Sequence, residues 1–272
     1  MQEVTCRLLR LPPFKPVAAK ILRLDSDASA SLSKVMQLIR SDPALTSEVL
    51  HLANSPLFGL KSEVHSVEHA AALVGLDRIK MLVMRVASEA FLGRDIHEPV
   101  IQHCWMHSIV SAEVAEQLAP IFIISKDRGS IVGLLHDIGR VGLLKAFARE
   151  YGPLVTAQYG TTEQCLTAER VLFQLDHCRT GAILTRTWGF PDYFSDIANT
   201  HHDRVLVDRD LAGLARLSCR LAACIGFPGT ITAEANYEEE LLRWPQEIRS
   251  RLVGKERLLR DSVKKKLDLL RV

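Results

Sequence analysis

The stretch that decides the fold spans residues 131–147 and reads IVGLLHDIGRVGLLKAF. Almost every side chain in it is apolar, and the exceptions are His136, Asp137, Arg140 and Lys145. A helix that is apolar on most of its sides belongs in the middle of a domain. We therefore predict a central helix over this stretch, which carries a histidine and an aspartate into the interior of the protein.

Helical periodicity extends through nearly all of the chain on both sides of this stretch. No convincing alternation of period two appears, so the predicted fold class is all-α. Asp42-Pro43 is a start signal, because an N-cap residue is followed by proline at the first helical position. Further helices are predicted at about 98–119, 148–158, 161–174, 176–187, 191–200 and 209–226.

The chain divides into three parts by composition. Residues 1–95 carry short capped helices without clustered chemistry, and residues 96–230 carry most of the histidines. No linker-like segment separates these halves, so we expect them to pack closely. Residues 231–272 are a charged helical extension, whose apolar positions are sparse for a core helix. We expect that extension on the surface or against a partner.

Composition excludes several classes of function. The chain has 272 residues, of which 47% are hydrophobic and 24% are charged, as in a globular protein with a sizeable core. A formal net charge of +2 gives no reason to expect nucleic-acid binding. No apolar run approaches the length of a membrane span, and the first ten residues lack the apolar core of a signal peptide. The expected location is the cytoplasm.

The six cysteines form no CxxC pair and lie mostly inside apolar helical patterns. They are Cys6, Cys104, Cys165, Cys178, Cys219 and Cys224. In a chain of this size without an export signal, we interpret them as reduced thiols, mostly buried.

The histidines are the main candidates for a functional site. Six of the ten lie between residues 103 and 202, as His103, His107, His136, His177, His201 and His202. His103 and His107 are four residues apart and share one face of a helix. Imidazole is the commonest metal-ligating side chain, and carboxylates complete such sites for harder cations.

Two readings of these histidines remain open from the residues alone. A single histidine in a core helix is usually a structural residue. The adjacent pairs His136-Asp137 and His201-His202 favour a metal site, because burying several imidazoles and a carboxylate is costly unless a cation or a full hydrogen-bond network compensates. With mixed ligands, one or two divalent ions of iron, manganese, zinc or nickel are possible. Arg140 lies four residues beyond His136 and is suited to hold an oxyanion. No Gly-rich phosphate loop is present, and no other cofactor is expected.

These residues carry a resemblance to a known family. Ile131–Leu144 resembles the core of the HD phosphohydrolase superfamily, and His107, in WMHS, matches its leading histidine. His177 and His201-His202 fall where HD-GYP cyclic-dinucleotide phosphodiesterases place theirs. In the first half, LPPFKPVAAKIL, DPALTSEVLHLANSPLFG and SVEHAAALVGLDRIKMLVM resemble the blocks of the HDOD domain, a bacterial signalling module related to HD-GYP. The resemblance runs from about Leu11 to Gly226.

The resemblance implies a fold and a set of ligands. The fold would be a multi-helix HD-like bundle packed against an N-terminal helical half. The implied metal ligands are His107, His136, Asp137, His177, His201 and His202, with Asp137 bridging. Arg140 replaces a lysine often found in the family and could hold phosphate, so Asp137 and Arg140 would be the catalytic residues if the protein is active.

Two departures from the family pattern count against catalysis. LARLSCRLAACIG places Cys219 where a late aspartate is expected, and DRVLVD follows His201-His202 in place of a GYP motif. Cys219 either ligates a softer ion or is a buried inert thiol, and the second reading is preferred. HDOD domains also commonly lose HD ligands.

Two hypotheses follow, and whether the chain is an enzyme stays open. The first is a signal-transduction module that acts through signalling protein partners, with a metal-binding site that is degenerate for catalysis. The second is a metal-dependent phosphohydrolase or phosphodiesterase that acts on a nucleotide or a cyclic dinucleotide. A phosphate-containing ligand is possible in either case, and neither nucleic acid nor a membrane is expected as a partner.

Overall fold

The computed structural model describes residues 2–24, 28–55, 63–203, 209–230 and 236–270. Within these ranges the regular elements are helices and no strand forms, which confirms the predicted all-α class. The first part contains α1 (Gln2–Leu9), α2 (Pro16–Leu22), α3 (Ala28–Arg40), α4 (Pro43–Ala53), α5 (Val67–Val74) and α6 (Leu76–Leu92).

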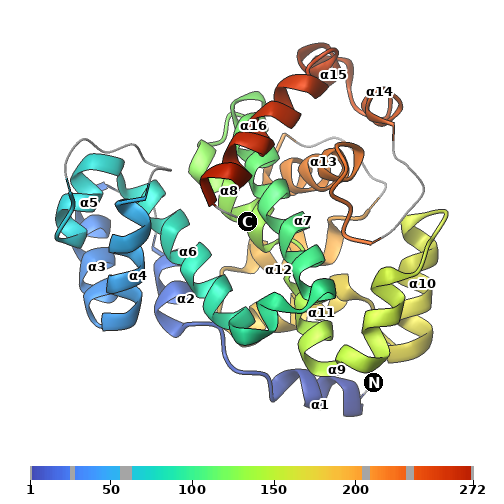
Figure 1. The fold of residues 1–272 in the computed structure, drawn as a ribbon, viewed down its shortest axis with the longest axis horizontal. Helices are drawn as coiled ribbons and strands as arrows, with labels where there is room; N and C mark the ends of the chain where they lie inside the picture. Colours follow the sequence, from blue (N-terminus) through green and yellow to red (C-terminus); the bar gives the residue numbers. More distant parts are fainter. Residues whose placement is uncertain (1, 25–27, 56–62, 204–208, 231–235, 271–272) are drawn as a thin grey trace.

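The rest of the described chain includes the longest helices and ends with the helices of the C-terminal extension. It consists of η1 (Gly93–His97), α7 (Pro99–Leu118), η2 (Ala119–Phe122), α8 (Lys126–Leu135), α9 (Ile138–Thr156), α10 (Thr162–Phe173), α11 (His177–Thr187), α12 (Asp192–Thr200), α13 (Leu211–Cys224), α14 (Tyr237–Leu241), α15 (Gln246–Leu252) and α16 (Glu256–Leu270). Figure 1 shows α3, α4 and α5 grouped at one end of the molecule, with α7 near the middle of the larger part.

The two halves share one hydrophobic core. It contains buried residues from Leu8 in α1 to Ala215 in α13, and α1 packs against α9 and α11 of the second half. The residues predicted to start a helix at Asp42-Pro43 do so at the N-terminus of α4. The Asp42 carboxylate accepts the backbone N–H of Leu45 at 2.9 Å, and Pro43 follows it at the first helical position.

The predicted central helix is the one element that the structure corrects. The apolar stretch does not form one helix over 131–147, because α8 ends at Leu135 and α9 begins at Ile138. The Asp137 backbone is not helical, with φ −105° and ψ 23°, so the helix is interrupted at the His136-Asp137 pair. A further non-helical residue, Phe147, lies inside α9 where the sequence predicted a helix boundary.

Close backbone packing holds this interruption in place. A Cβ atom at Gly133 would lie 2.5 Å from the Ser111 carbonyl oxygen, so α8 touches α7 at that position. A Cβ atom at Gly139 would lie 1.9 Å from the His177 carbonyl oxygen and 2.4 Å from the Gly181 nitrogen, so α9 touches α11. Glycine is required at both positions because a side chain would force the helices apart.

We expect Gly139→Ala to destabilise the protein by about 2–3 kcal/mol, because the added methyl group meets backbone atoms that cannot rotate away. Gly152→Ala, also in α9, is the matched control. A Cβ atom there meets nothing within 4 Å, and alanine favours the helix by about 0.5–1 kcal/mol. Urea unfolding of both variants checks this. Equal stability of the two variants would contradict the close packing of α9 on α11.

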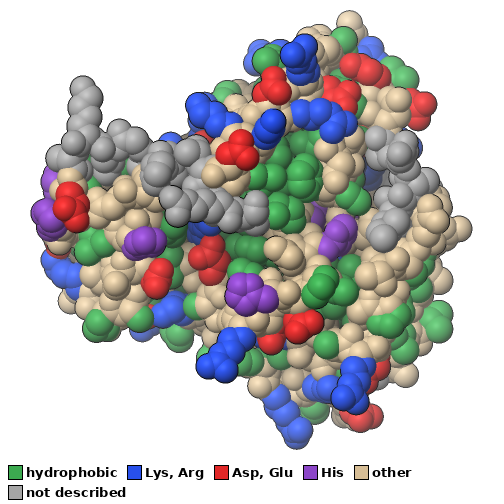
Figure 2. Space-filling model, viewed as in Figure 1, with side chains coloured by type: hydrophobic (Ala, Val, Ile, Leu, Met, Phe, Trp, Pro, Cys, Tyr) green, Lys and Arg blue, Asp and Glu red, His purple; other side chains and the backbone are tan. Residues whose placement is uncertain are grey.

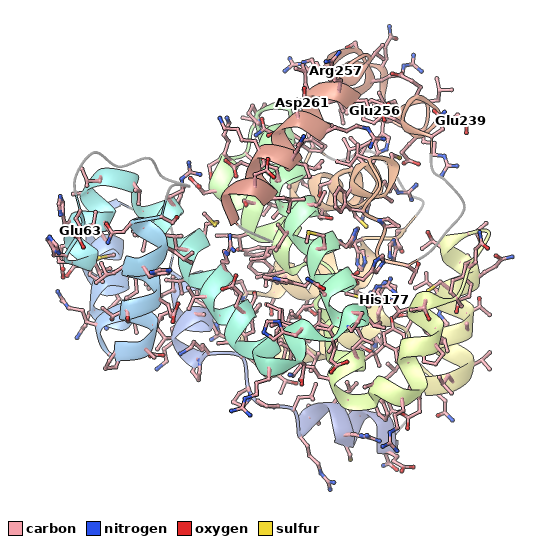
Figure 3. The ribbon with its side chains drawn as sticks, in the orientation of Figure 1. Glu63, His177, Glu239, Glu256, Arg257 and Asp261 are labelled. Atoms are coloured by element: carbon pink, nitrogen blue, oxygen red, sulfur yellow. The ribbon has the colours of Figure 1, made fainter. Side chains whose placement is uncertain are left out.

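The C-terminal extension contributes to a second hydrophobic cluster. Leu259 and Val263 of α16 are buried in it, and so is Trp244, which precedes α15. The few apolar residues of α16 are enough to anchor this helix, because it buries only one narrow face against α7. There, the Lys266 ammonium lies 3.2 Å from the Glu113 carboxylate. Figure 3 shows the charged side chains Glu256, Arg257 and Asp261 on the outer side of α16.

None of the helices in the described part combines the length and the apolar composition that crossing a bilayer requires.

Candidate metal centre

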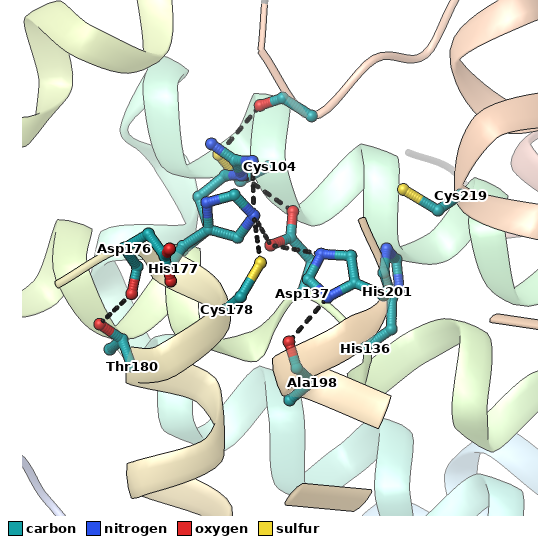
Figure 4. Close-up of polar contacts among 12 residues, drawn as sticks. Cys104, His136, Asp137, Asp176, His177, Cys178, Thr180, Ala198, His201 and Cys219 are labelled. Carbon is teal, nitrogen blue, oxygen red and sulfur yellow. Dashed lines mark hydrogen bonds and ion pairs between the residues drawn. The ribbon is translucent and has the colours of Figure 1, made fainter. Parts of the chain in front are cut away.

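The interruption between α8 and α9 lies at the middle of a cluster of histidines. The structure brings together all six side chains that the sequence analysis proposed as metal ligands. They are His107 of α7, His136 and Asp137 between α8 and α9, His177 at the start of α11, and His201 and His202 at the end of α12; we call them the His/Asp cluster. Figure 4 shows part of this cluster, and Figure 3 labels His177 in the interior.

The histidine rings of the cluster contact one another in succession, and Asp137 lies beside them. The ring centres of His107 and His136 are 5.3 Å apart, and those of His136 and His201 are 5.0 Å apart. The His177 ring lies 5.4 Å from His201 and 5.1 Å from His202. Asp137 Oδ1 lies 3.6 Å from His177 Nε2 and 3.9 Å from His201 Nε2. The carboxylate therefore faces several imidazole nitrogens.

Backbone carbonyls select the tautomer of three rings. In each ring the Nδ1–H group donates to a carbonyl oxygen, which leaves the Nε2 lone pair pointing into the cluster. The bonds run from His107 to Phe227 (2.7 Å), from His136 to Gly133 (2.7 Å) and from His201 to Ala198 (2.8 Å). This arrangement is typical of metal-binding histidines, whose second nitrogen is held by a hydrogen bond.

Several inward-facing atoms have no hydrogen-bond partner among the described residues. They are Nε2 of His103, His136, His201 and His202, and Oδ1 of Asp137. His136, Asp137 and His201 are at most 2% exposed, so leaving these atoms unpaired is costly. A cation in the cluster would give a partner to the buried atoms of His136, His201 and Asp137, so the donor set fits a metal ion.

A second group of buried residues forms hydrogen bonds to His177 and Asp137 of the cluster. The Glu169 carboxylate accepts the Nδ1–H and the backbone N–H of His177 at 2.7 and 2.8 Å, and it accepts the Tyr151 hydroxyl at 2.6 Å. Arg140 donates to Asp137 Oδ2 at 2.9 Å and to His177 Nε2 at 3.1 Å. It also donates to Tyr151 at 3.0 Å and reaches Glu169 at 3.4 Å.

Sequence reasoning missed Glu169 and Tyr151. Glu169 lies on the amphipathic helix α10, where nothing in the pattern distinguishes an inward-facing carboxylate from a solvated one. Arg140 was predicted to hold an oxyanion, yet its guanidinium bonds to protein groups on every nitrogen. Its role in the structure is to orient Asp137 and His177.

Burial governs the protonation of the cluster. It lowers the pKa of His107 to about 3, of His136 to about 4 and of His201 to about 3, and neighbouring imidazoles add to the shift. Burial alone would raise the pKa of Asp137, but Arg140 and the surrounding histidines hold it well below its usual value. The rings of His107, His136 and His201 are therefore neutral and the Asp137 carboxylate is ionised, which is the state that binds metal.

Acid is therefore expected to destabilise the metal-free protein steeply. The unfolded chain binds protons at His107, His136 and His201 below pH 6.5, whereas the folded chain does not until its pKa values of about 3 to 4 are reached. Stability is lost as the pH falls from 6.5 towards 4, with a slope that approaches about 4 kcal/mol per pH unit for three protons.

Urea unfolding across this pH range, with a chelator present, measures the slope. His136→Gln should reduce the proton uptake by about one. A flat profile between pH 6.5 and 4 would show that the rings are not buried as neutral groups.

Two thiols adjoin the cluster from opposite sides. Cys219 Sγ lies 3.5 Å from His107 Nε2, and Cys178 Sγ lies 3.6 Å from His177 Nε2. The donor atoms of His107, His136 and Cys219 lie within 4.8 Å of one another, as do those of His177, Cys178, His201 and His202. Figure 4 shows Cys178 next to the His177 ring and Cys219 on the far side of the His136 and His201 rings.

One side of the cluster is covered by Gly229, and two histidines on its periphery are less deeply buried. Gly229 lies directly over it, because a Cβ atom there would be 3.2 Å from Asp137 Oδ2 and 3.3 Å from the His107 ring. His103 and His202 are half-buried, so the cluster approaches solvent near them. In Figure 2 a histidine side chain is visible near the centre of the face that is drawn.

The sequence of this chain was compared with known families. Residues 11–204, most of the chain, match the HDOD domain. The chain belongs to the HDOD domain family. This confirms the resemblance on which the ligand set was proposed. An uncharacterized protein of Treponema pallidum (strain Nichols) is 23% identical to this HDOD protein over 203 residues, which are 74% of this chain and 39% of that relative. The chain thus spans about two fifths of the relative's length.

Solved structures share the fold of this HDOD protein. A candidate signal transduction protein from Marinobacter aquaeolei VT8 is 20% identical, with a TM-score of 0.72 over 97% of this chain and 60% of that one. An HDOD domain protein of unknown function from Geobacter sulfurreducens is 22% identical, with a TM-score of 0.70 over 97% of this chain and 98% of that one. A candidate phosphohydrolase from Shewanella amazonensis SB2B is 17% identical, with a TM-score of 0.63 over 98% and 94% of the two chains. At these identities the likeness shows the fold alone.

Proposed function

We propose that this HDOD protein is a signal-transduction module that binds one or two divalent metal ions at the His/Asp cluster and acts through protein contacts. The observation that carries the proposal is the set of buried, unpartnered atoms that converge on one interior point. His136 Nε2, His201 Nε2 and Asp137 Oδ1 have no hydrogen-bond partner among the described residues, and a cation provides one.

The residues that would hold the metal are those of the His/Asp cluster, with Asp137 placed between its two ends. His177 would join them through Nε2 only by releasing the hydrogen bond that this atom accepts from Arg140. A divalent ion there supplies positive charge to the carboxylates and can polarise a phosphate ester. Glu169 and Arg140 keep His177 and Asp137 in position through direct hydrogen bonds. The metal is thus a structural or sensory element in this proposal.

Three features support a loss of catalysis. The Arg140 guanidinium is committed to Asp137, Tyr151 and His177, so it has little capacity left to hold a phosphate. Gly229 lies over Asp137, where a substrate would otherwise approach. Cys219 occupies the position at which the resemblance places an aspartate. The signalling role is supported by the similarity to the Marinobacter aquaeolei protein, which is named for signal transduction.

The second candidate function is a metal-dependent phosphohydrolase. It is favoured by the retention of all six proposed ligands in one cluster, and by the shared fold with two Shewanella amazonensis SB2B proteins named as candidate phosphohydrolases, one of them metal-dependent. If this function is correct, Asp137 and Arg140 are the residues expected to act on the substrate.

Elemental analysis and a turnover assay on the same preparation separate these functions. The chain is purified without chelator or nickel affinity, its metal content is measured, and it is assayed on cyclic dinucleotides and a chromogenic phosphodiester with added manganese, iron, zinc or nickel. Near-stoichiometric metal without turnover is the expected result. Turnover that His136→Ala abolishes would replace the proposal by the phosphohydrolase, and absence of metal would overturn the metal-binding part.

A further inference from the structure

Cys219 is buried at one end of the His/Asp cluster. It lies on α13, is 5% exposed, and its Sγ atom is 3.5 Å from His107 Nε2. One donor atom from each of His107, His136 and Cys219 lies within 4.8 Å of the other two. Three potential ligand atoms from three separate segments of the chain therefore meet at one point.

The hydrogen bonds of the two rings determine which atoms face the thiol. Both Nδ1–H groups are bound to backbone carbonyls at 2.7 Å, so only the Nε2 lone pairs of His107 and His136 remain for the interior. A single S–H group is a weak donor and can satisfy one of them at most. His136 Nε2 has no partner among the described residues although its residue is 1% exposed.

The buried charges around the cluster are consistent with a thiolate ligand when a single divalent ion is bound. The buried charges in contact with the cluster are one arginine, Arg140, and two carboxylates, Asp137 and Glu169, which leave one negative charge in excess. A divalent ion alone would leave one positive charge in excess. A divalent ion together with one thiolate makes this buried group of charges neutral, which avoids the cost of an uncompensated charge.

Resting on the proposed metal-binding function, we propose that Cys219 binds the metal as a thiolate beside His107 and His136. On binding, the thiol proton passes to solvent and an S–metal bond forms, with no change of oxidation state. Thiolate and imidazole ligands suit borderline ions, whereas carboxylate and water ligands suit hard ions. The site therefore selects zinc over manganese and magnesium.

X-ray absorption at the zinc edge detects the sulfur ligand directly. In the wild-type chain loaded with zinc, one sulfur scatterer is expected at about 2.3 Å, beside nitrogen and oxygen scatterers at about 2.0–2.1 Å. Cys219→Ser should remove the sulfur scatterer and keep the others. Cys224→Ser is the matched control, because Cys224 is also buried on α13 but packs in the second hydrophobic cluster.

A selectivity measurement gives a second readout. Competition between zinc and manganese for the chelator-treated chain should favour zinc, and Cys219→Asp should reduce that preference on the order of tenfold by exchanging a soft ligand for a hard one. Cys178→Ser should leave the sulfur scatterer and the preference unchanged, since Cys178 lies beside His177 at the other end of the cluster.

The outcomes separate this inference from the proposed function. A wild-type chain that binds no metal overturns both. Bound zinc without a sulfur scatterer in the wild type, which requires no variant to fold, overturns the role of Cys219 and leaves metal binding intact. A sulfur scatterer that survives in Cys219→Ser but disappears in Cys178→Ser also overturns it, by placing the thiolate at the His177 end.

Discussion

The double variant His136→Ala/Asp137→Ala will retain less than about a tenth of the metal that the wild-type chain binds. Both residues present unpartnered donor atoms to the centre of the cluster, and Asp137 lies between its two ends. Losing a single residue that supports a metal ligand typically lowers metal affinity 10- to 100-fold. Removing two of the ligands themselves is expected to lower the affinity by more than this. Elemental analysis after gel filtration measures the effect.

The control for this result is an exposed pair of the same chemistry. His97 and Glu98 are an adjacent histidine and carboxylate on the surface at the start of α7, and their double alanine variant should keep the wild-type metal content. Circular dichroism checks that both variants are folded. Wild-type metal content in the His136/Asp137 variant would show that the ion, if bound, lies elsewhere.

The Glu169→Ala variant will lose about 3–5 kcal/mol of unfolding free energy, as expected when one member of a buried ionic network is removed. The Glu169 side chain is fully buried and accepts hydrogen bonds from Tyr151 and from two groups of His177. Its loss leaves these donors unpaired and removes one of the two carboxylates that face Arg140.

Urea unfolding measures this loss, and Glu163→Ala on the same helix is the control. Glu163 pairs with Arg170, and the two side chains are 56% and 48% exposed, so less than about 1 kcal/mol is expected. A cost below 1 kcal/mol for Glu169→Ala as well would show that the network behind the cluster contributes little to stability.

Much of the site was predictable because its residue types are rare in a helical core. Buried imidazoles and a carboxylate in apolar patterns need compensation, which favoured a metal site at His136-Asp137 and His201-His202, and the resemblance to the HD superfamily supplied the full ligand set. Glu169 and Tyr151 were not predictable, since a glutamate on an amphipathic helix is ordinarily solvated. Their inward orientation depends on how α10 packs against α9, which periodicity does not encode.

The interruption of the central helix was not predictable for a related reason. Helix ends are normally marked by glycine, proline or a capping side chain, and the Asp137 side chain makes no capping hydrogen bond. Hydrophobic periodicity continues across the break because both helices are buried on most sides. Only the contacts at Gly133 and Gly139 reveal why the chain turns there.

The same interruption explains why the histidine precedes the aspartate in the chain. The C-terminal end of α8 and the N-terminal end of α9 meet at His136 and Asp137, and the dipoles of the two helices place partial negative charge on the first end and partial positive charge on the second. An N–H donor is favoured at the first end, where His136 donates to the Gly133 carbonyl, and an anion is favoured at the second. The opposite order would put the aspartate carboxylate at the C-terminal end of α8, where an anion is disfavoured. The direction of the two helices thus favours a histidine at position 136 and an aspartate at position 137.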